Sequence, residues 1–289
     1  MVKAHTFFSI LMTAYNREQY IAQAIESVLN QSYKYFELII VDDSSSDNTV
    51  KIVHSYAKSD SRIKLHVNKE NIGDYPNRNR AASYAQGDIF IYVDSDDTIN
   101  TDTLSYILEC FNKFTLAEFA TIYNGNDIRN VTSLSNRVSL RKHFFEKSFL
   151  HIGPGGTVIK KSLFDNIGGF PVNYGPAGDM FYNIKAASTS PVICMPYNYL
   201  NYRRHEGQEI NDSYAYLHNG YRYFNDVLSL AEIPLKESQK DYLKLKNKRR
   251  FFINSIKYLL KSRNLRKFKA AYTLAEFTIK DIFKAIFQW

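Results

Sequence analysis

The chain has 289 residues, 45% of them hydrophobic and 23% charged, so it can bury the core of one large domain, or of one domain with an appendage. Its two cysteines, Cys110 and Cys194, form neither a disulfide framework nor a zinc site, which favours a reducing compartment. No stretch approaches the roughly 18 apolar residues that span a bilayer, and the apolar segment 7–12 is too short for a secretory signal. We therefore expect a cytoplasmic protein, free or bound peripherally to the inner face of a membrane.

The net charge of +8 is unevenly distributed along the chain. Residues 213–289 contain 16 Lys and Arg against 6 Asp and Glu, a balance of +10, whereas the remainder carries −2. This shift predicts a main domain over residues 1–212 and a basic extension over residues 213–289.

The first hundred residues alternate between short apolar runs and amphipathic segments. Alternation at this spacing predicts an α/β fold with a mainly parallel sheet flanked by helices. The expected strands are residues 7–13, 38–41, 63–67 and 89–93; the expected helices are residues 20–29, 50–57, 77–85 and one capped by Thr101 or Asp102.

The second half of the chain is less regular. Residues 123–137 are polar and predict a loop. Further strands are expected at 157–159 and 192–195, with a helix at 179–187 between them, and the pattern beyond residue 212 is helical throughout.

Three polar clusters follow expected strands, at residues 13–16, 42–47 and 94–97. Ligands of parallel α/β sheets bind beyond the carboxyl ends of the strands, so these clusters should converge on one site. In the last cluster, Asp94, Asp96 and Asp97 end a buried strand, which is costly unless positive charge lies among them. Carboxylates and substrate phosphates are the usual ligands of Mg²⁺ or Mn²⁺, so the cluster predicts a metal and nucleotide site.

Residues 5–210 resemble the inverting family 2 glycosyltransferases with the GT-A fold. The resemblance rests on an ordered series of motifs, which are Ala14-Tyr15-Asn16, Asp42-Asp43-Ser44-Ser45-Ser46-Asp47, Asn71-Ile72-Gly73, Arg78-Asn79, Asp94-Ser95-Asp96-Asp97, Gly168-Gly169-Phe170 and Gly178-Asp179. It implies a GT-A catalytic domain over residues 1–212, Rossmann-like and with a mixed, mainly parallel sheet flanked by helices, and a helical C-terminal extension over residues 213–289.

By this resemblance, Thr13, Tyr15 and Asp43 line the nucleobase pocket of a nucleotide-sugar donor. Tyr15 can stack on a base and Asp43 can accept the imide N–H of uracil, which favours a UDP-sugar. The alternatives are a packing role for Tyr15 and a helix cap for Asp43. Arg78 is expected to contact phosphate or base, with an exposed salt bridge as the alternative.

The resemblance also implies a metal site. Asp96, or Asp97 beside it, would bind Mn²⁺ or Mg²⁺ at the donor diphosphate, and Asp94 would reach the ribose. His205, in the sequence Tyr202-Arg203-Arg204-His205, would complete the metal shell or be an ordinary surface residue.

Asp179 occupies the position of the family's general base, where a carboxylate takes the proton of the acceptor hydroxyl. A simple capping role at the start of a helix is the alternative. The family more often has an acidic residue directly before this Asp, where this chain has Gly178.

The expected function is therefore metal-dependent, inverting transfer of a sugar from a nucleotide donor to a hydroxyl acceptor. The acceptor is a carbohydrate or a lipid-linked sugar in surface polysaccharide or glycolipid synthesis. One rival is a sugar-nucleotide pyrophosphorylase, but those enzymes have a Gly-rich turn after the first strand, and residues 13–16 contain no glycine. The other is a catalytically silent scaffold that binds nucleotide-sugars.

The basic extension combines apolar and Lys/Arg-rich faces on its expected helices. Such helices bind anionic membrane surfaces, pack on the main domain or self-associate into a homo-oligomer, and these three alternatives stay open. No nucleic-acid motif accompanies the charge, so nucleic acid is not expected as a partner.

Overall fold

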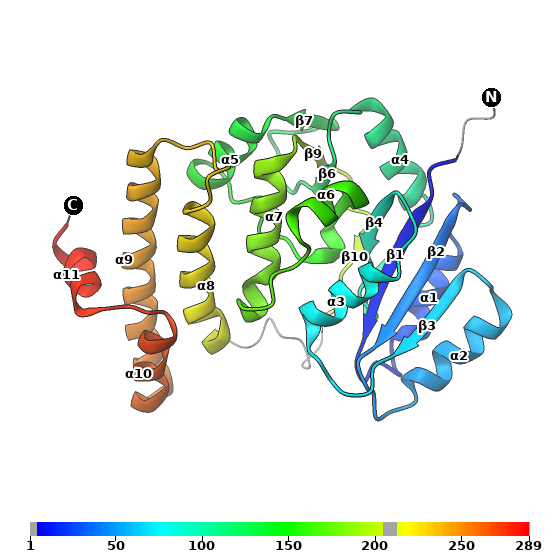
Figure 1. The fold of residues 1–289 in the computed structure, drawn as a ribbon, viewed down its shortest axis with the longest axis horizontal. Helices are drawn as coiled ribbons and strands as arrows, with labels where there is room; N and C mark the ends of the chain where they lie inside the picture. The colour runs from blue at the N-terminus through cyan, green and yellow to red at the C-terminus, as the bar shows by residue number, and fades with distance from the viewer. Residues whose placement is uncertain (1–4, 205–212, 289) are drawn as a thin grey trace.

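The structure, a computed structural model, describes residues 5–204 and 213–288 of the chain. Its first four strands are parallel neighbours in the order β3-β2-β1-β4 (Figure 1). Their bounds are β1 (Phe8–Ala14), β2 (Phe36–Asp42), β3 (Ile63–Val67) and β4 (Ile89–Tyr92). The register pairs Phe8 with both Phe36 and Ile89, so β1, β2 and β4 begin level with one another, and β4 ends opposite Leu11, three residues before the end of β1.

The second half of the chain extends the same sheet in the order β8-β6-β9-β7. Strand β8 lies antiparallel between β4 and β6, and β7 is antiparallel to β9, which makes the sheet mixed as expected. The bounds of these strands are β6 (Phe119–Ile122), β7 (Thr132–Leu134), β8 (Thr157–Lys160) and β9 (Val192–Met195). A separate two-stranded sheet pairs β5 (Thr98–Ile99) with β10 (Leu200–Asn201) in antiparallel orientation.

Helices cover both faces of this sheet, because successive strand residues point to opposite sides. Ile10 and Met12 of β1 pack on one face with α1 (Ile21–Leu29), α2 (Thr49–Ser59) and α4 (Thr103–Lys113). Leu11, between them, packs on the other face. That second core contains residues of α3 (Asp74–Ser83), α5 (Asn136–Phe145), α6 (Lys161–Ile167) and α7 (Gly178–Thr189).

Three sequence expectations need correction. The predicted loop 123–137 contains β7, and α5 begins within it at Asn136, while α6 was not anticipated. Helix α3 begins at Asp74 rather than at residue 77, because Gly73, with φ +87°, ends the preceding loop in a conformation open to glycine. Two short one-turn helices, Pro154–Gly156 and Gly175–Ala177, also precede β8 and α7.

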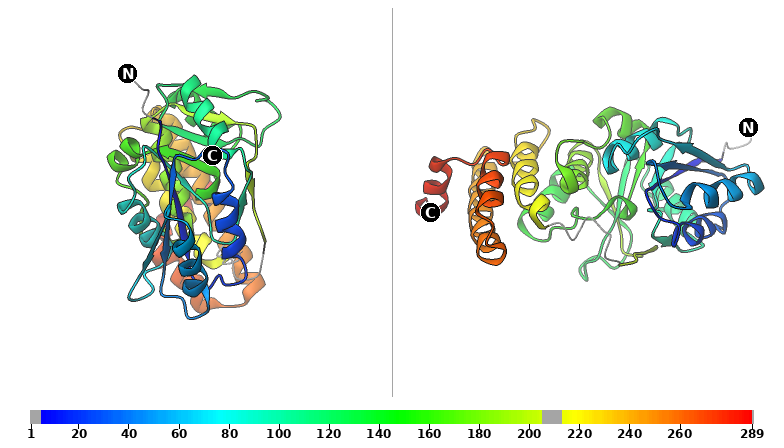
Figure 2. Two further views of the ribbon diagram at one scale, coloured as in Figure 1. Left: turned by 90° about the vertical axis from the view of Figure 1, so that its right-hand side faces the viewer. Right: turned by 90° about the horizontal axis from the view of Figure 1, so that it is seen from below.

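The C-terminal helices stack outward from α7 (Figures 1 and 2). They are α8 (Ser213–Leu228), α9 (Glu237–Ser262), α10 (Leu265–Leu274) and α11 (Ile279–Phe287). Tyr223 of α8 and Leu243 of α9 belong to the core that also contains α7, while Phe251 and Phe277 centre a smaller core among α8 to α11. The domain boundary at residue 212 stays a prediction. Within the described ranges, no helix has the length and apolar character needed to cross a membrane.

Candidate functional site

The carboxyl ends of β1, β2 and β4 open into a cavity of about 720 Å³. The strand register brings Ala14 opposite Asp42, and the Asp43 amide donates to the Ala14 carbonyl at 2.8 Å, so the loops after β1 and β2 meet. Helix α7 and the segment 151–154 form the far wall. The polar clusters that follow the first strands therefore converge, as their sequence positions predicted.

Most of the predicted site residues line this one cavity. Asp97 lies buried beneath its wall, and His205 falls outside the described residues. The predicted residues that line the cavity are Thr13, Tyr15, Asp43, Arg78, Asp94, Asp96 and Asp179.

Arginines from distant segments neutralise the acidic cluster at the end of β4. Arg17, in the loop after β1, bonds Asp96 at 3.1 Å, and Arg78 of α3 lies 2.7 Å from Asp94. Arg203 donates its amide to Asp97 at 2.9 Å and its guanidinium to the Asp96 carbonyl. Asp96 and Asp94 thus each have a guanidinium partner, whereas Asp97 is bound by a backbone amide.

The same cluster has the donor set of a hard divalent cation. Asp94, Asp96 and Asp97 each offer one oxygen, and these atoms lie within 4.8 Å of one another. Burial raises the pKa of Asp94, and it raises the pKa of Asp97 to about 7. An added positive charge would favour the ionised form of both groups, so these residues fit Mg²⁺ or Mn²⁺.

The predicted base pocket has one exposed ring and one fixed carboxylate. Tyr15 is 47% exposed at the cavity, so its ring is available for stacking. Asp43 is buried and accepts hydrogen bonds from the Ile72 and Gly73 amides, both at 2.9 Å, and from the Asn68 side chain at 2.7 Å. These bonds orient the Asp43 carboxylate and hold the loop before α3 against the pocket; they do not act as a helix cap.

Arg78 forms buried salt bridges rather than the exposed one that was the alternative to a phosphate or base contact. Its guanidinium contacts Asp74 at 2.9 Å as well as Asp94, and it lies 5.7 Å from the centre of the Tyr92 ring. Arg78 and Asp94 both line the cavity, so their salt bridge orients the Asp94 carboxylate there.

Asp179 enters the cavity from the second half of the chain, in the first turn of α7. Its carboxylate accepts the Met180 amide at 2.7 Å, and its own amide donates to the Tyr75 hydroxyl at 3.0 Å. Burial raises the pKa of the Asp179 carboxyl to about 7, although the Met180 bond and the charge of Arg78 act in the opposite direction. A carboxyl with this pKa can exchange protons near neutral pH.

The glycine before Asp179 has a packing reason. A Cβ at Gly178 would lie 2.7 Å from Cε2 of Tyr75 and 3.1 Å from the Pro171 carbonyl oxygen. The Tyr75 ring, which is buried, could not move aside without losing its bond to the Asp179 amide. An acidic residue at position 178 is therefore incompatible with this arrangement.

Several residues of the site were missed from the sequence. Arg17, Tyr75 and His151 contact or line the cavity. Arg17 directly follows the Ala14-Tyr15-Asn16 motif. Its positive charge at the end of a strand was a signal in the sequence that could have identified it as a partner of the acidic cluster. Tyr75 and His151 have no such signal, because only tertiary packing brings them to Asp179 and to the cavity wall.

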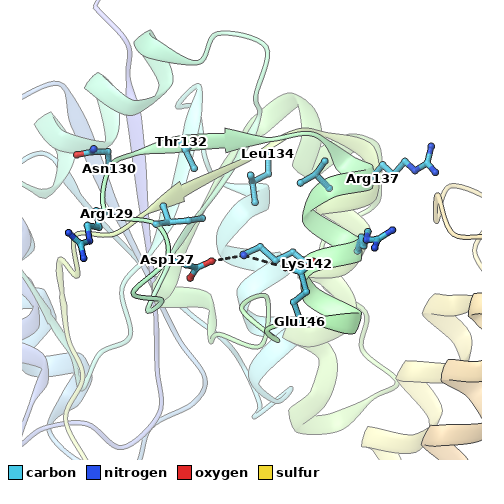
Figure 3. A pocket seen from close by; sticks show the side chains of 11 residues that line it. Asp127, Arg129, Asn130, Thr132, Leu134, Arg137, Lys142 and Glu146 are labelled. Atoms are coloured by element: carbon cyan, nitrogen blue, oxygen red, sulfur yellow. Dashed lines mark hydrogen bonds and ion pairs between the residues drawn. The ribbon is translucent and has the colours of Figure 1, made fainter.

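A second cavity, of about 630 Å³, lies between β7, α5 and the loop 127–130 (Figure 3). Its central carboxylate, Asp127, is bonded to Lys142 at 2.5 Å. The other charged side chains that line it are Arg129, Arg137, Arg141 and Glu146, and none of the predicted site residues lines it. The site therefore belongs at the ends of β1, β2 and β4.

The glycosyl transferase family 2 model matches residues 9–168, which cover β1 through α6. The chain belongs to glycosyl transferase family 2. The match includes the acidic cluster and the base pocket, and α7 with Asp179 follows directly after it.

Relatives match this family 2 glycosyltransferase over different lengths. A glycosyltransferase of Haemophilus influenzae without an assigned reaction is 38% identical over 130 residues, 43% of this chain and 52% of that protein, so the match spans about half of its length. The GalNAc(5)-diNAcBac-PP-undecaprenol β-1,3-glucosyltransferase of Campylobacter jejuni is 28% identical over 82% of this chain and 78% of its own.

A solved structure shows the same fold. The structure of Staphylococcus aureus TarS 1–349 in complex with UDP matches with a TM-score of 0.70 and 21% identity, covering 97% of this chain and 81% of that one. The likeness shows the GT-A fold with its C-terminal helices, as expected from the sequence.

We predict that Gly178→Ala lowers the free energy of unfolding by about 1–3 kcal/mol, because the new methyl group overpacks the Tyr75 ring. Urea denaturation followed by circular dichroism measures the change. The matched control is Gly220→Ala in α8, where a Cβ meets no atom within 4 Å and the helix should gain roughly 0.5–1 kcal/mol. Equal stability of Gly178→Ala and wild type would show that the Tyr75 ring accommodates the added methyl group.

Proposed function

We propose that this protein transfers a sugar, with inversion, from a UDP-sugar to a hydroxyl group of a carbohydrate or lipid-linked acceptor. The observation that supports this proposal most is that carboxylates from two different elements line one cavity. Asp94 and Asp96 line it at the end of β4, and Asp179 lines it at the start of α7. Inverting transfer needs one charged site for the leaving group and one base for the acceptor.

The nucleotide half of the donor lies, in this proposal, against the loops after β1 and β2. The exposed ring of Tyr15 stacks on the base, and Thr13 lines the pocket beside it. Asp43, whose carboxylate is already oriented by backbone amides, accepts the imide N–H of uracil. The UDP complex of the structurally similar TarS is consistent with this choice of nucleotide.

The diphosphate then lies at the acidic cluster. Asp96 and Asp97 would hold Mg²⁺ or Mn²⁺, with Asp94 beside them toward the ribose. A cation bound there supplies positive charge to the diphosphate oxygens. Arg17, which bonds Asp96 in this structure, is placed to contact a phosphate oxygen when that carboxylate is otherwise engaged.

The transfer itself requires Asp179. The acceptor hydroxyl oxygen attacks the anomeric carbon and forms the new glycosidic bond while the bond from that carbon to the phosphate oxygen breaks. The electron pair leaves with the nucleoside diphosphate, and the hydroxyl proton passes to the Asp179 carboxylate. The positive end of α7 and the charge of Arg78 favour the ionised form of Asp179 before the attack.

We predict that Asp179→Asn lowers kcat by roughly 10²–10⁴-fold, because the amide cannot accept the proton. The affinity for UDP, measured by calorimetry, should stay within about two-fold of wild type, because Asp179 is outside the base pocket. Ser188→Ala, at the distal end of α7, is the matched control and should retain activity. Transfer by Asp179→Asn at the wild-type rate would refute the base assignment.

The Asp179 carboxyl also predicts how the rate of transfer depends on pH. Below its pKa of about 7 Asp179 is protonated and cannot act as a base, so kcat/KM should rise with pH through this value and then level off. Rates measured between about pH 5.5 and 8.5 test the expectation. A flat profile over this range would contradict the assignment.

We predict that Asp96→Ala abolishes the gain in UDP affinity that Mn²⁺ provides, a loss of about ten-fold or more. Titrations of UDP with and without Mn²⁺ measure it. The control is Asp165→Ala, which removes an exposed carboxylate paired with Lys161 on α6. The metal assignment fails if Mn²⁺ strengthens UDP binding equally in Asp96→Ala and wild type.

We also propose that the protein associates peripherally with the cytoplasmic face of an anionic membrane through α11. Phe283 and Phe287, exposed by 64% and 63%, share one face of this helix, and Lys280 and Lys284 flank them. Apolar side chains beside lysines bind the interface of anionic bilayers. The C. jejuni relative, named for an undecaprenol-linked substrate, is consistent with this location.

We predict that Phe283→Glu with Phe287→Glu prevents flotation with anionic liposomes, whereas wild type floats with them. Leu116→Glu, which charges an 87% exposed residue far from α11 in sequence, is the control and should float. Point variants are preferable to removal of α9 to α11, since Leu243 of α9 belongs to the main core. Flotation of the double variant with wild type would exclude this surface.

A further inference from the structure

The cavity that contains Asp179 continues beyond α7. Met180 and Tyr216 line it, and both also line two adjoining cavities of about 230 and 590 Å³ between α7, α8 and α9. We name these two cavities together the α8–α9 groove. In Figure 1, α8 and α9 lie on the side of α7 away from β1, β2 and β3, so the groove extends away from the nucleotide half.

The inner end of the groove has uncharged hydrogen-bonding groups. His151 lines both the main cavity and the smaller groove cavity, and its Nε2 lies 3.0 Å from the Tyr223 hydroxyl. Burial, with the nearby charge of Arg250, lowers the pKa of His151 to about 4, so the ring is neutral at physiological pH. A neutral imidazole that shares this cavity with Tyr216 and Tyr223 is suited to contact with sugar hydroxyls.

The groove is cationic along one face of α9. Arg250 lines the smaller cavity with His151, and Lys257 and Lys261 line the larger cavity. Their spacings of seven and four residues place the three side chains on the same side of the helix. Within residues 5–204 and 213–288, no salt bridge engages these three side chains. The distance along the axis from Arg250 to Lys257 is about 10 Å, which accommodates two linked phosphates.

Apolar side chains accompany these cations. Leu217 and Tyr258 line the larger cavity together with the two lysines and Met180. Beyond the groove, Ile253 and Leu260 of α9 are 50% and 73% exposed. A phosphorylated polymer has no apolar portion that would use these residues, whereas a phosphate attached to a hydrocarbon chain has one.

We propose that the α8–α9 groove binds the acceptor as a lipid-linked sugar diphosphate. Arg250, Lys257 and Lys261 contact the diphosphate, and Leu217 and Tyr258 contact the start of the hydrocarbon chain. The sugar then lies at His151 and Tyr216, with its hydroxyl toward Asp179. This inference rests on the proposed function and adds to it the chemical class and the binding residues of the acceptor.

The test measures binding of two synthetic probes to the full chain in the presence of UDP. One probe is decyl diphosphate-linked N-acetylglucosamine, and the other is decyl N-acetylglucosaminide, which lacks the diphosphate. Wild type should bind the first about ten-fold more tightly or better. Lys257→Ala with Lys261→Ala should lose this preference, and Lys257→Arg with Lys261→Arg should keep it.

The matched control is Lys244→Ala with Lys246→Ala, which removes two lysines of α9 that do not line the groove. It should bind both probes as wild type does. If Lys257→Ala with Lys261→Ala keeps the preference for the diphosphate probe, the groove assignment is wrong. Equal binding of soluble poly(glycerol phosphate) and the diphosphate probe would overturn the lipid assignment.

Failure of the groove proposal is distinguishable from failure of the proposed function by titration with UDP. UDP should bind wild type and both lysine-to-alanine variants with affinities within about two-fold, because Thr13, Tyr15 and Asp43 line neither cavity of the groove. If UDP binds all of them and only the probe result fails, the acceptor site lies elsewhere. If wild type binds no UDP, the proposed function itself is wrong.

Discussion

The rest of the structure depends on how the acidic end of β4 is neutralised. Asp94, Asp96 and Asp97 follow a strand buried in the centre of the sheet, and unpaired carboxylates there would cost several kcal/mol each. Arg17, in the loop after β1, pairs with Asp96, and Arg78 of α3 pairs with Asp94. The backbone amide of Arg203, after β10, binds Asp97. These contacts hold the loops of the site at one edge of the sheet, where the same charged groups could bind a diphosphate and a metal ion.

The second constraint is the packing of α7 on the sheet. Tyr75 of α3 packs in the shared core and accepts a hydrogen bond from the Asp179 amide, so α3 and α7 are joined directly at Asp179, the proposed base. Gly178 is the residue that permits this contact. The close packing explains why this family 2 glycosyltransferase lacks an acidic residue at that position, and it links the stability of the core to the geometry of Asp179.

Sequence reasoning succeeded where a pattern is local and repeated. The apolar runs of β1, β2 and β4 and the polar residues after them identified both the parallel sheet and the cavity at its edge. It failed at β7, whose Thr132-Ser133-Leu134 shows no alternation, and at α5 and α6, which are short and lack a clear apolar period. It also could not anticipate the antiparallel insertion of β8 beside β4, because pairing between distant strands leaves no local trace.

The sequence by itself determined the α/β class, the family motifs and seven of the residues that line the cavity, because each depends on the order of residue types along a short stretch of chain. Tertiary structure alone decided the partners of those residues. That Arg17 faces Asp96, that Tyr75 supports Asp179, and that His151 connects the cavity to the α8–α9 groove follow from contacts across 79, 104 and 72 positions of sequence. Such contacts arise when separate helices bury their apolar faces on one sheet, and no single segment encodes them.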